Sequence, residues 1–217
     1  MLWGVGEAQQ QVAPARGRYR ATLAALLVIV LLGAAVAILA ATGGLETSTR
    51  RGPVEHGPQE EFTSSDMRIT VERAVVVDQL PGSGVFTDAD AGERVFAVLI
   101  EVENLDVDPR LARSDGGLSR VIADFGIEGE PEISVYGDGD FSVVTLQPGV
   151  PARLLLSWMV DDDQIGDGDD VHLTMPDAEK RESTLTPGTF VWDELPPSAV
   201  VVTTVEDLGE GREDGRL

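Results

Sequence analysis

Aspartate is the most abundant chemically useful side chain in this sequence, and residues 161–170 (DDDQIGDGDD) carry its densest group. Hard cations such as Ca²⁺ take about six to eight oxygen ligands, which a loop between two strands can supply. The EF-hand spacing is absent, because the fifth position from Asp161 is Ile165 and the twelfth is His172 instead of Glu. A different type of calcium site has four candidate ligands, which are Asp161, Asp163, Asp167 and Asp169. The alternative interpretation is a solvated acidic turn in an acidic protein.

Residues suited to nucleophilic or redox catalysis are scarce. The chain has two histidines, His56 and His172, and no cysteine. It contains no G-x-S-x-G elbow and no glycine-rich phosphate-binding loop. Paired carboxylates could serve a hydrolase, but acidic residues are too numerous here for any one pair to be informative. We therefore expect a protein that is not an enzyme, with no catalytic residues and no cofactor other than the Ca²⁺ considered above.

The net charge of −22 narrows the classes of partner. A strongly acidic surface repels nucleic acids and anionic lipid headgroups, so we expect neither as a partner. Cations and basic protein surfaces remain compatible with this charge. Since the chain lacks cysteines, disulfides cannot stabilise it, and the burial of apolar side chains must do so.

An uncharged apolar segment, Ala21 to Thr42, divides the chain into two unequal parts. A helix of this length is roughly 33 Å long, and the hydrocarbon core of a bilayer is about 30 Å thick. Three arginines lie in the five residues before it, which predicts a cytoplasmic tail at 1–20, a transmembrane helix at 21–42 and an extracellular remainder at 43–217. Ala35-Val36-Ala37 has the form of a signal-peptidase site, but the apolar run continues beyond it, so an uncleaved signal-anchor is the preferred interpretation.

The residues after this segment predict a linker, one β domain and a tail. Residues 43–66 are polar and contain glycine and proline, which is typical of a flexible linker, and they include His56, which we expect to be solvated. Residues 67–205 alternate apolar and polar side chains with turn-forming residues between the runs. Residues 206–217 are acidic and predict a disordered tail.

Individual runs within 67–205 predict particular strands. In the first run Arg73 falls on the apolar face, which predicts a bulge or a break there. Residues 94–104 are apolar on both faces before turning polar, as in a central strand. We expect Trp158 and Trp192 to be core residues, and residues 199–205 to be either buried or available as a sheet edge. Eight or nine such strands, without a soluble helix, predict an antiparallel immunoglobulin-like β-sandwich, with a barrel as the alternative.

Two motifs carry a resemblance to a known group of proteins. A hydrophobic strand ends in asparagine before an acidic turn (FAVLIEVEN-LDVDP), and a Pro-Gly turn leads into another strand (LQPG-VPARLLLSWMV). With the apolar segment upstream, the chain resembles the membrane-anchored immunoglobulin-like (immunoprotective-type) extracellular domains of unknown function from Gram-positive bacteria. The resemblance implies a sandwich fold and no catalytic residues.

The functional expectation follows from the layout of anchor, linker and β domain. We expect a single-pass binding or interaction module in the cell membrane, whose partner is an envelope protein or polymer. The alternative is a Ca²⁺-dependent structural or sensory protein of the cell envelope that uses residues 161–170.

Overall fold

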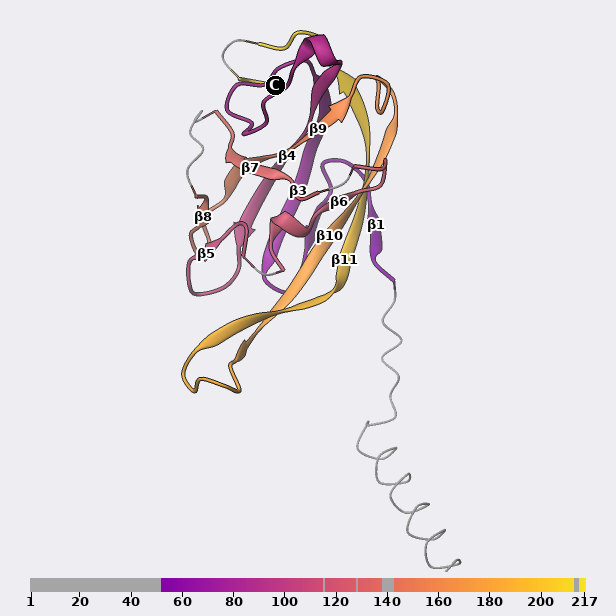
Figure 1. The fold of residues 1–217 in the computed structure, drawn as a ribbon. Helices are drawn as coiled ribbons and strands as arrows, with labels where there is room; N and C mark the ends of the chain where they lie inside the picture. The colour runs from indigo at the N-terminus through magenta and orange to yellow at the C-terminus, as the bar shows by residue number, and fades with distance from the viewer. Residues whose placement is uncertain (1–51, 115, 128, 138–142, 213–214) are drawn as a thin grey trace, which may run out of the picture. The chain divides into compact units, whose positions relative to one another are not determined.

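Strands form almost all of the regular structure in residues 52–217 (Figure 1). The computed structural model describes these residues except 115, 128, 138–142 and 213–214. The strands are β1 (Val54–His56), β2 (Glu61–Thr63), β3 (Met67–Val77), β4 (Glu93–Asn104), β5 (Arg110–Leu111), β6 (Ile122–Ala123), β7 (Glu132–Val135), β8 (Thr145–Leu146), β9 (Ala152–Asp161), β10 (Asp170–Glu182) and β11 (Phe190–Asp207). Two short 3₁₀ helices, η1 (Ala89–Ala91) and η2 (Leu118–Arg120), lie between them. The all-β class predicted from the sequence is confirmed.

The predicted membrane segment and the tail before it, residues 1–42, lie outside the described residues. Within the described part of the chain, no helix is both long and apolar enough to cross a membrane.

Nine of the strands belong to one curled sheet, whose main order is β6-β10-β11-β3-β4-β9-β7. β11 meets β3 only at Val205–Asp207, and the two strands diverge beyond this contact. Where β11 and β3 have diverged, each leaves an exposed edge. β1 pairs with β11 and β2 pairs with β3, so each short strand covers one of these two edges of the split. The expectation of a purely antiparallel sheet is wrong, because β1 and β3 both run parallel to β11. β5 and β8 form a separate two-stranded sheet.

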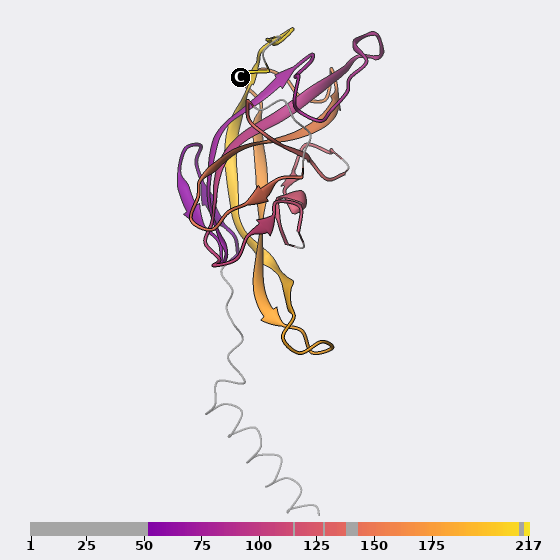
Figure 2. The same cartoon turned by 90° about the vertical axis from the view of Figure 1, so that its left-hand side faces the viewer.

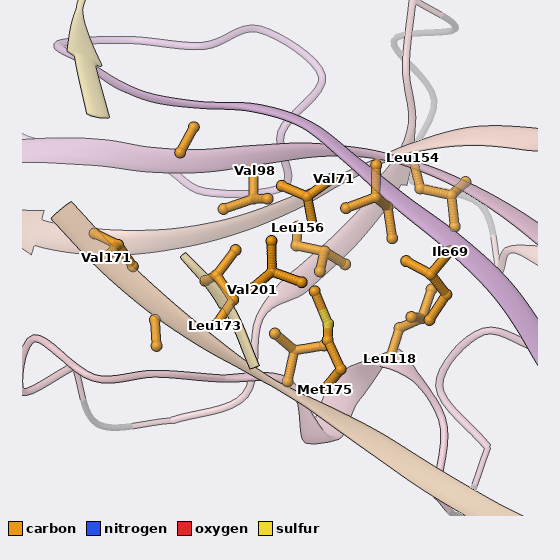
Figure 3. Packing of buried hydrophobic residues seen from close by; sticks show 14 of the residues in the cluster. Ile69, Val71, Val98, Leu118, Leu154, Leu156, Val171, Leu173, Met175 and Val201 are labelled. Atoms are coloured by element: carbon orange, nitrogen blue, oxygen red, sulfur yellow. The ribbon is translucent and has the colours of Figure 1, made fainter. Parts of the chain in front are cut away.

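The two halves of the curled sheet enclose one hydrophobic core (Figure 3). Side chains of β10 and β11 face those of β3, β4 and β9, while Leu118 of η2 lies at the side; the labelled members are Ile69, Val71, Val98, Leu118, Leu154, Leu156, Val171, Leu173, Met175 and Val201. Trp158 belongs to this core, as predicted, and is 4% exposed. The facing halves give the domain the layered character expected of a sandwich.

β4 is the central strand that its sequence predicts. It pairs with β3 on one side and with β9 on the other, and both of its faces are buried. Its second face, with Val95, Ala97 and Leu99, forms a smaller apolar cluster with β3 and β9. The bulge predicted near Arg73 is also confirmed, because the register of β3 against β4 shifts between Val71 and Arg73.

The prediction of a flexible linker at residues 43–66 is wrong for the second half of this range. β1 and β2 are strands of the sheet, and Phe62 is only 5% exposed. The imidazole of His56 is not solvated as expected, because it stacks on Phe62 with ring centroids 5.1 Å apart and lies 3.1 Å from the Glu60 carboxylate. The physical reason is the split between β11 and β3, which leaves two edges for short strands to cover.

The predicted disordered tail, residues 206–217, also differs from the structure. β11 continues to Asp207, and Leu208 and Leu217 pack against the second apolar cluster. The backbone N–H of Leu217 donates a 3.1 Å hydrogen bond to the Tyr136 hydroxyl. The packing of these two partly buried leucines and this hydrogen bond hold the described residues of a segment whose composition alone suggested disorder.

Candidate functional site

The aspartates of residues 161–170 do not converge on one point. Asp161 ends β9, and Asp163 lies exposed in the turn that follows. Asp167 accepts a 3.1 Å hydrogen bond from the backbone N–H of Asp207, and Asp169 accepts one of 2.9 Å from that of Gly166. Among the described residues, no group of three or more acidic or histidine side chains is arranged to hold a metal ion. Asp167 and Asp169 therefore stabilise the turn between β9 and β10 by accepting backbone hydrogen bonds.

The two histidines occupy different elements, each beside a carboxylate. His56 lies on β1 next to Glu60, and His172 lies on β10 with its Nδ1 2.9 Å from an oxygen of Asp124. His172 and Asp124 are each about half exposed. The structure thus places the histidines at separate positions on the sheet.

The most distinctive surface feature is a hairpin arm formed by the far ends of β10 and β11 (Figures 1 and 2). We define the arm as residues 177–195, in which Asp177 pairs with Leu195 and Glu182 pairs with Phe190. The register shifts between Met175 and Asp177, around Pro176, and two further prolines follow Leu195 on β11. A proline lacks the N–H that a ladder needs, so the pairing is interrupted where the arm leaves the body of the domain.

Large apolar side chains are exposed along the arm. Leu185, in the turn at its tip, is 92% exposed, and Phe190 is 59% exposed. An isolated two-stranded hairpin is marginally stable in water, so an arm of this kind needs further contacts to stay ordered.

Lys180, the only lysine in the sequence, supplies one of those contacts. Its ammonium lies 2.5 Å from an oxygen of Asp108 and 3.0 Å from one of Asp106, both in the turn after β4. The hydrogen bond that the Lys180 ammonium donates to Asp108, followed by the one that it donates to Asp106, raises the pKa of Lys180 above its usual value. The same ammonium lies 5.4 Å from the centre of the Phe190 ring. The arm is therefore tied to the turn that follows the central strand.

A buried ion pair lies beside the base of the arm. The carboxylate of Asp66 binds the guanidinium of Arg110, and their side chains are only 4% and 3% exposed. Arg110 also donates hydrogen bonds of 3.1 and 2.9 Å to the hydroxyl of Ser114, and Ser64 donates one of 3.1 Å to Asp66. Burial lowers the pKa of Arg110 to about 10. A buried pair with these additional bonds fixes the position of both side chains.

Arg110 also contacts the arm directly. Its guanidinium carbon lies 4.1 Å from the centre of the Trp192 ring, which is a cation–π contact. The prediction that Trp192 is a core residue is therefore wrong. The ring is half-buried on the arm, where it covers the buried ion pair, and it does not join the hydrophobic core.

A groove of about 330 Å³ separates the base of the arm from the segment containing η2 and β6. Arg120 crosses it and lies 3.0 Å from the Glu194 carboxylate, and Ile122 is 62% exposed at its rim. Next to the groove, a Cβ on Gly116 would lie 2.4 Å from that of Ala178, so the loop before η2 packs directly on the arm. The arm is thus anchored on two sides.

The arm and its buried ion pair were not recognised in the sequence. The partners Asp66 and Arg110 are far apart along the chain, and Arg110 follows a turn motif that gives no sign of burial. The apolar residues of the arm resemble those of any other strand. A signal was present in the prolines of PPS at 196–198, which interrupt an otherwise continuous strand pattern.

Comparisons with known proteins assign no family to the chain. No protein-family model matches it, and no curated protein sequence matches it. Similar solved structures include an uncharacterised β-sandwich protein from Clostridium difficile, with a TM-score of 0.43 and 14% identity over 73% of this chain and 97% of that one. Another is a presumed lipoprotein from Bacillus subtilis, with a TM-score of 0.40 and 16% identity over 69% of this chain and 39% of that one.

Proposed function

We propose that the protein is a binding module displayed outside the cell membrane, and that the arm is the part that contacts its partner. The observation that carries the proposal is an ordered hairpin with exposed Leu185 and Phe190, held in place by Lys180 and Arg110. Exposed apolar groups on a projecting element are unfavourable for an isolated domain and are typical of interaction sites. The partner in this proposal is an envelope protein or polymer.

Membrane attachment is the second part of the proposal. It rests on the uncharged segment Ala21 to Thr42 and on the three arginines before it, which favour a single-pass orientation with the N-terminus in the cytoplasm. The resemblance to immunoprotective-type, immunoglobulin-like extracellular domains of Gram-positive bacteria belongs to the same proposal. In this arrangement the strongly acidic β domain faces outward.

In-cell photo-crosslinking from single positions tests the role of the arm. A photoreactive amino acid replaces Leu185 or Phe190 in the full-length chain, and Val143 serves as a control because it is also exposed, at 74%, but lies outside the arm. We expect one discrete adduct from each arm position and none from position 143. Identical adduct patterns from all three positions would contradict the proposal.

A further inference from the structure

The chain enters the β domain at the end from which the arm leaves. β1 is the first strand that the structure describes, and it runs parallel to β11 with Val54 beside Ala199. Going back along the chain from Val54 therefore leads in the same direction as going back along β11 from Ala199, which is toward Phe190 and the arm. Figure 1 shows the start of β1 and the arm at the same end of the domain. The chain before β1 is thus attached on the side that carries the arm.

The length of chain before β1 limits how far the arm can lie from a membrane. Residues 43–53 connect the apolar segment Ala21 to Thr42 with Val54. An extended chain spans at most about 3.5 Å per residue, so this connection reaches at most about 40 Å. Phe190 precedes Ala199 on β11 by nine positions, which is up to about 30 Å at the rise of a β-strand. The arm is therefore almost as long as the connection at full stretch.

The tip of the arm carries no charge. Residues 183–191 (STLTPGTFV) contain no charged side chain, although the protein as a whole carries −22. Leu185 and Phe190 both lie in this stretch, and both are exposed. An uncharged, partly apolar tip fits a partner surface that is itself uncharged and apolar.

Two features favour a protein over the lipid bilayer as the occupant. In the described part of the chain, no further strand pairs with the outer edges of the arm, so backbone N–H and C=O groups of 179–182 and 190–194 face outward. Water or a protein can bind such groups, whereas the hydrocarbon of a bilayer cannot. Glu179 and Glu182 are exposed on the arm, and they repel anionic lipid headgroups.

We propose that the partner of the arm is an integral membrane protein of the same membrane, contacted close to the outer face of the bilayer. This inference rests on the proposed function, since it takes the arm as the contact site and residues 21–42 as the anchor. Leu185 and Phe190 supply the apolar contact. Lys180 and Arg110 hold the arm in place before the partner binds, so less conformational entropy is lost on binding.

Photo-crosslinking followed by proteolytic release identifies where the partner resides. The full-length chain carries a photoreactive amino acid in place of Leu185 and a protease site inserted between Ser48 and Thr49, before the described residues. After irradiation of cells, the wall is digested, and the membranes are washed with sodium carbonate and treated with the protease. We expect the uncrosslinked domain to be released and the crosslinked domain to stay with the membranes, because an integral membrane partner then holds it there.

The other outcomes separate this inference from the proposed function. Release of the adduct together with a soluble protein, its recovery with an envelope polymer, or a mass increase equal to that of a lipid would overturn the inference and leave the arm as the contact site. The absence of any adduct from position 185 would overturn the proposed function, and this inference with it.

Matched spacers, inserted between Ser48 and Thr49 without the protease site, test the limit on distance. A spacer of four EAAAK repeats is predominantly helical and about 30 Å long, whereas a Gly-Ser spacer of the same number of residues is flexible and still permits short distances. We expect the helical spacer to lower the adduct yield from position 185 at least about fivefold and the flexible one less than about twofold, because spacer stiffness sets the effective concentration of the partner. Near-ultraviolet circular dichroism checks that both chains are folded. Equal yields from the two chains would overturn the inference.

Discussion

Asp66 and Arg110 form an ion pair that is almost completely removed from solvent. Taking two charges out of water is costly, and the loss of one partner leaves the other charged and buried. We therefore expect Arg110→Met to lower the free energy of unfolding by about 3–5 kcal/mol, and Asp66→Asn/Arg110→Met to recover part of this loss. Urea denaturation of residues 52–217 measures both values.

The exposed pair of Arg113 and Glu132 provides a control for this experiment. Their side chains are 41% and 53% exposed, so Arg113→Met should cost less than about 1 kcal/mol. An equal loss for Arg110→Met and Arg113→Met would contradict the stabilising role of the buried pair.

Asp207 gives the stability of the domain a defined dependence on pH. Hydrogen bonds from the Arg94 guanidinium lower the pKa of the Asp207 carboxyl to about 2, whereas its value in an unfolded chain is about 3.9. Because the folded pKa is the lower one, Asp207 stabilises the fold above pH 4, and this contribution disappears as the pH falls toward 2.

The variant Asp207→Asn isolates this contribution. With allowance for solvent screening, we expect the wild type to exceed the variant by about 1–2 kcal/mol in unfolding free energy near pH 6, and by almost nothing near pH 2. Urea denaturation at several pH values provides the measurement. A difference that stays constant with pH would show that Asp207 acts through some other interaction.

At the residue scale, the sequence correctly predicted the role of a side chain where that role depends only on nearby residues in the chain. The bulge at Arg73 and the burial of Trp158 both follow from alternation within one strand. The pairing of Asp66 with Arg110 depends on how two distant turns meet, and local alternation carries no information about it. For the same reason, the sequence alone could not show whether the aspartates of residues 161–170 bind a cation or accept backbone hydrogen bonds. In the structure Asp167 and Asp169 accept such bonds.

At the scale of elements, strand length decided what could be predicted. β3, β4 and β9 each contain several apolar–polar repeats, and the sequence predicted all three. β1 and β2 have three residues each, which is too short for a period of two to stand out. Their position depends instead on the divergence of β11 from β3, a consequence of sheet topology that no single segment encodes.

The arm is the element whose order depends most on a few contacts. In Lys180→Met, the ion pairs with Asp106 and Asp108 are lost, so the arm should open more often. Hydrogen–deuterium exchange should become faster at residues 178–182 and 190–194 and stay unchanged in β4 and β9. Arg181→Met is the matched control, since its partner Asp193 lies within the arm itself. Equal acceleration in both variants would show that Lys180 does not tie the arm to the domain.

At the scale of the whole molecule, charge and hydrophobicity are strongly segregated along the chain. The apolar segment Ala21 to Thr42 carries no charge, whereas the protein as a whole carries −22. A negatively charged domain is repelled by the anionic cytoplasmic leaflet, and arginines before the apolar segment are retained on the cytoplasmic side. Both effects favour the proposed orientation, in which the arm lies outside the cell.

Single cysteines can report this orientation, since the natural sequence has none. In the full-length chain expressed in Gram-positive cells, a membrane-impermeant maleimide should label Thr184→Cys, at the exposed tip of the arm, without any treatment. It should label Ala8→Cys only after the membrane is permeabilised, because the proposed orientation places residues 1–20 in the cytoplasm. Labelling of Ala8→Cys alone in intact cells would reverse the proposed orientation. Loss of the Ala8→Cys residue from the mature protein, detected by its mass, would instead identify residues 21–42 as part of a cleaved signal peptide.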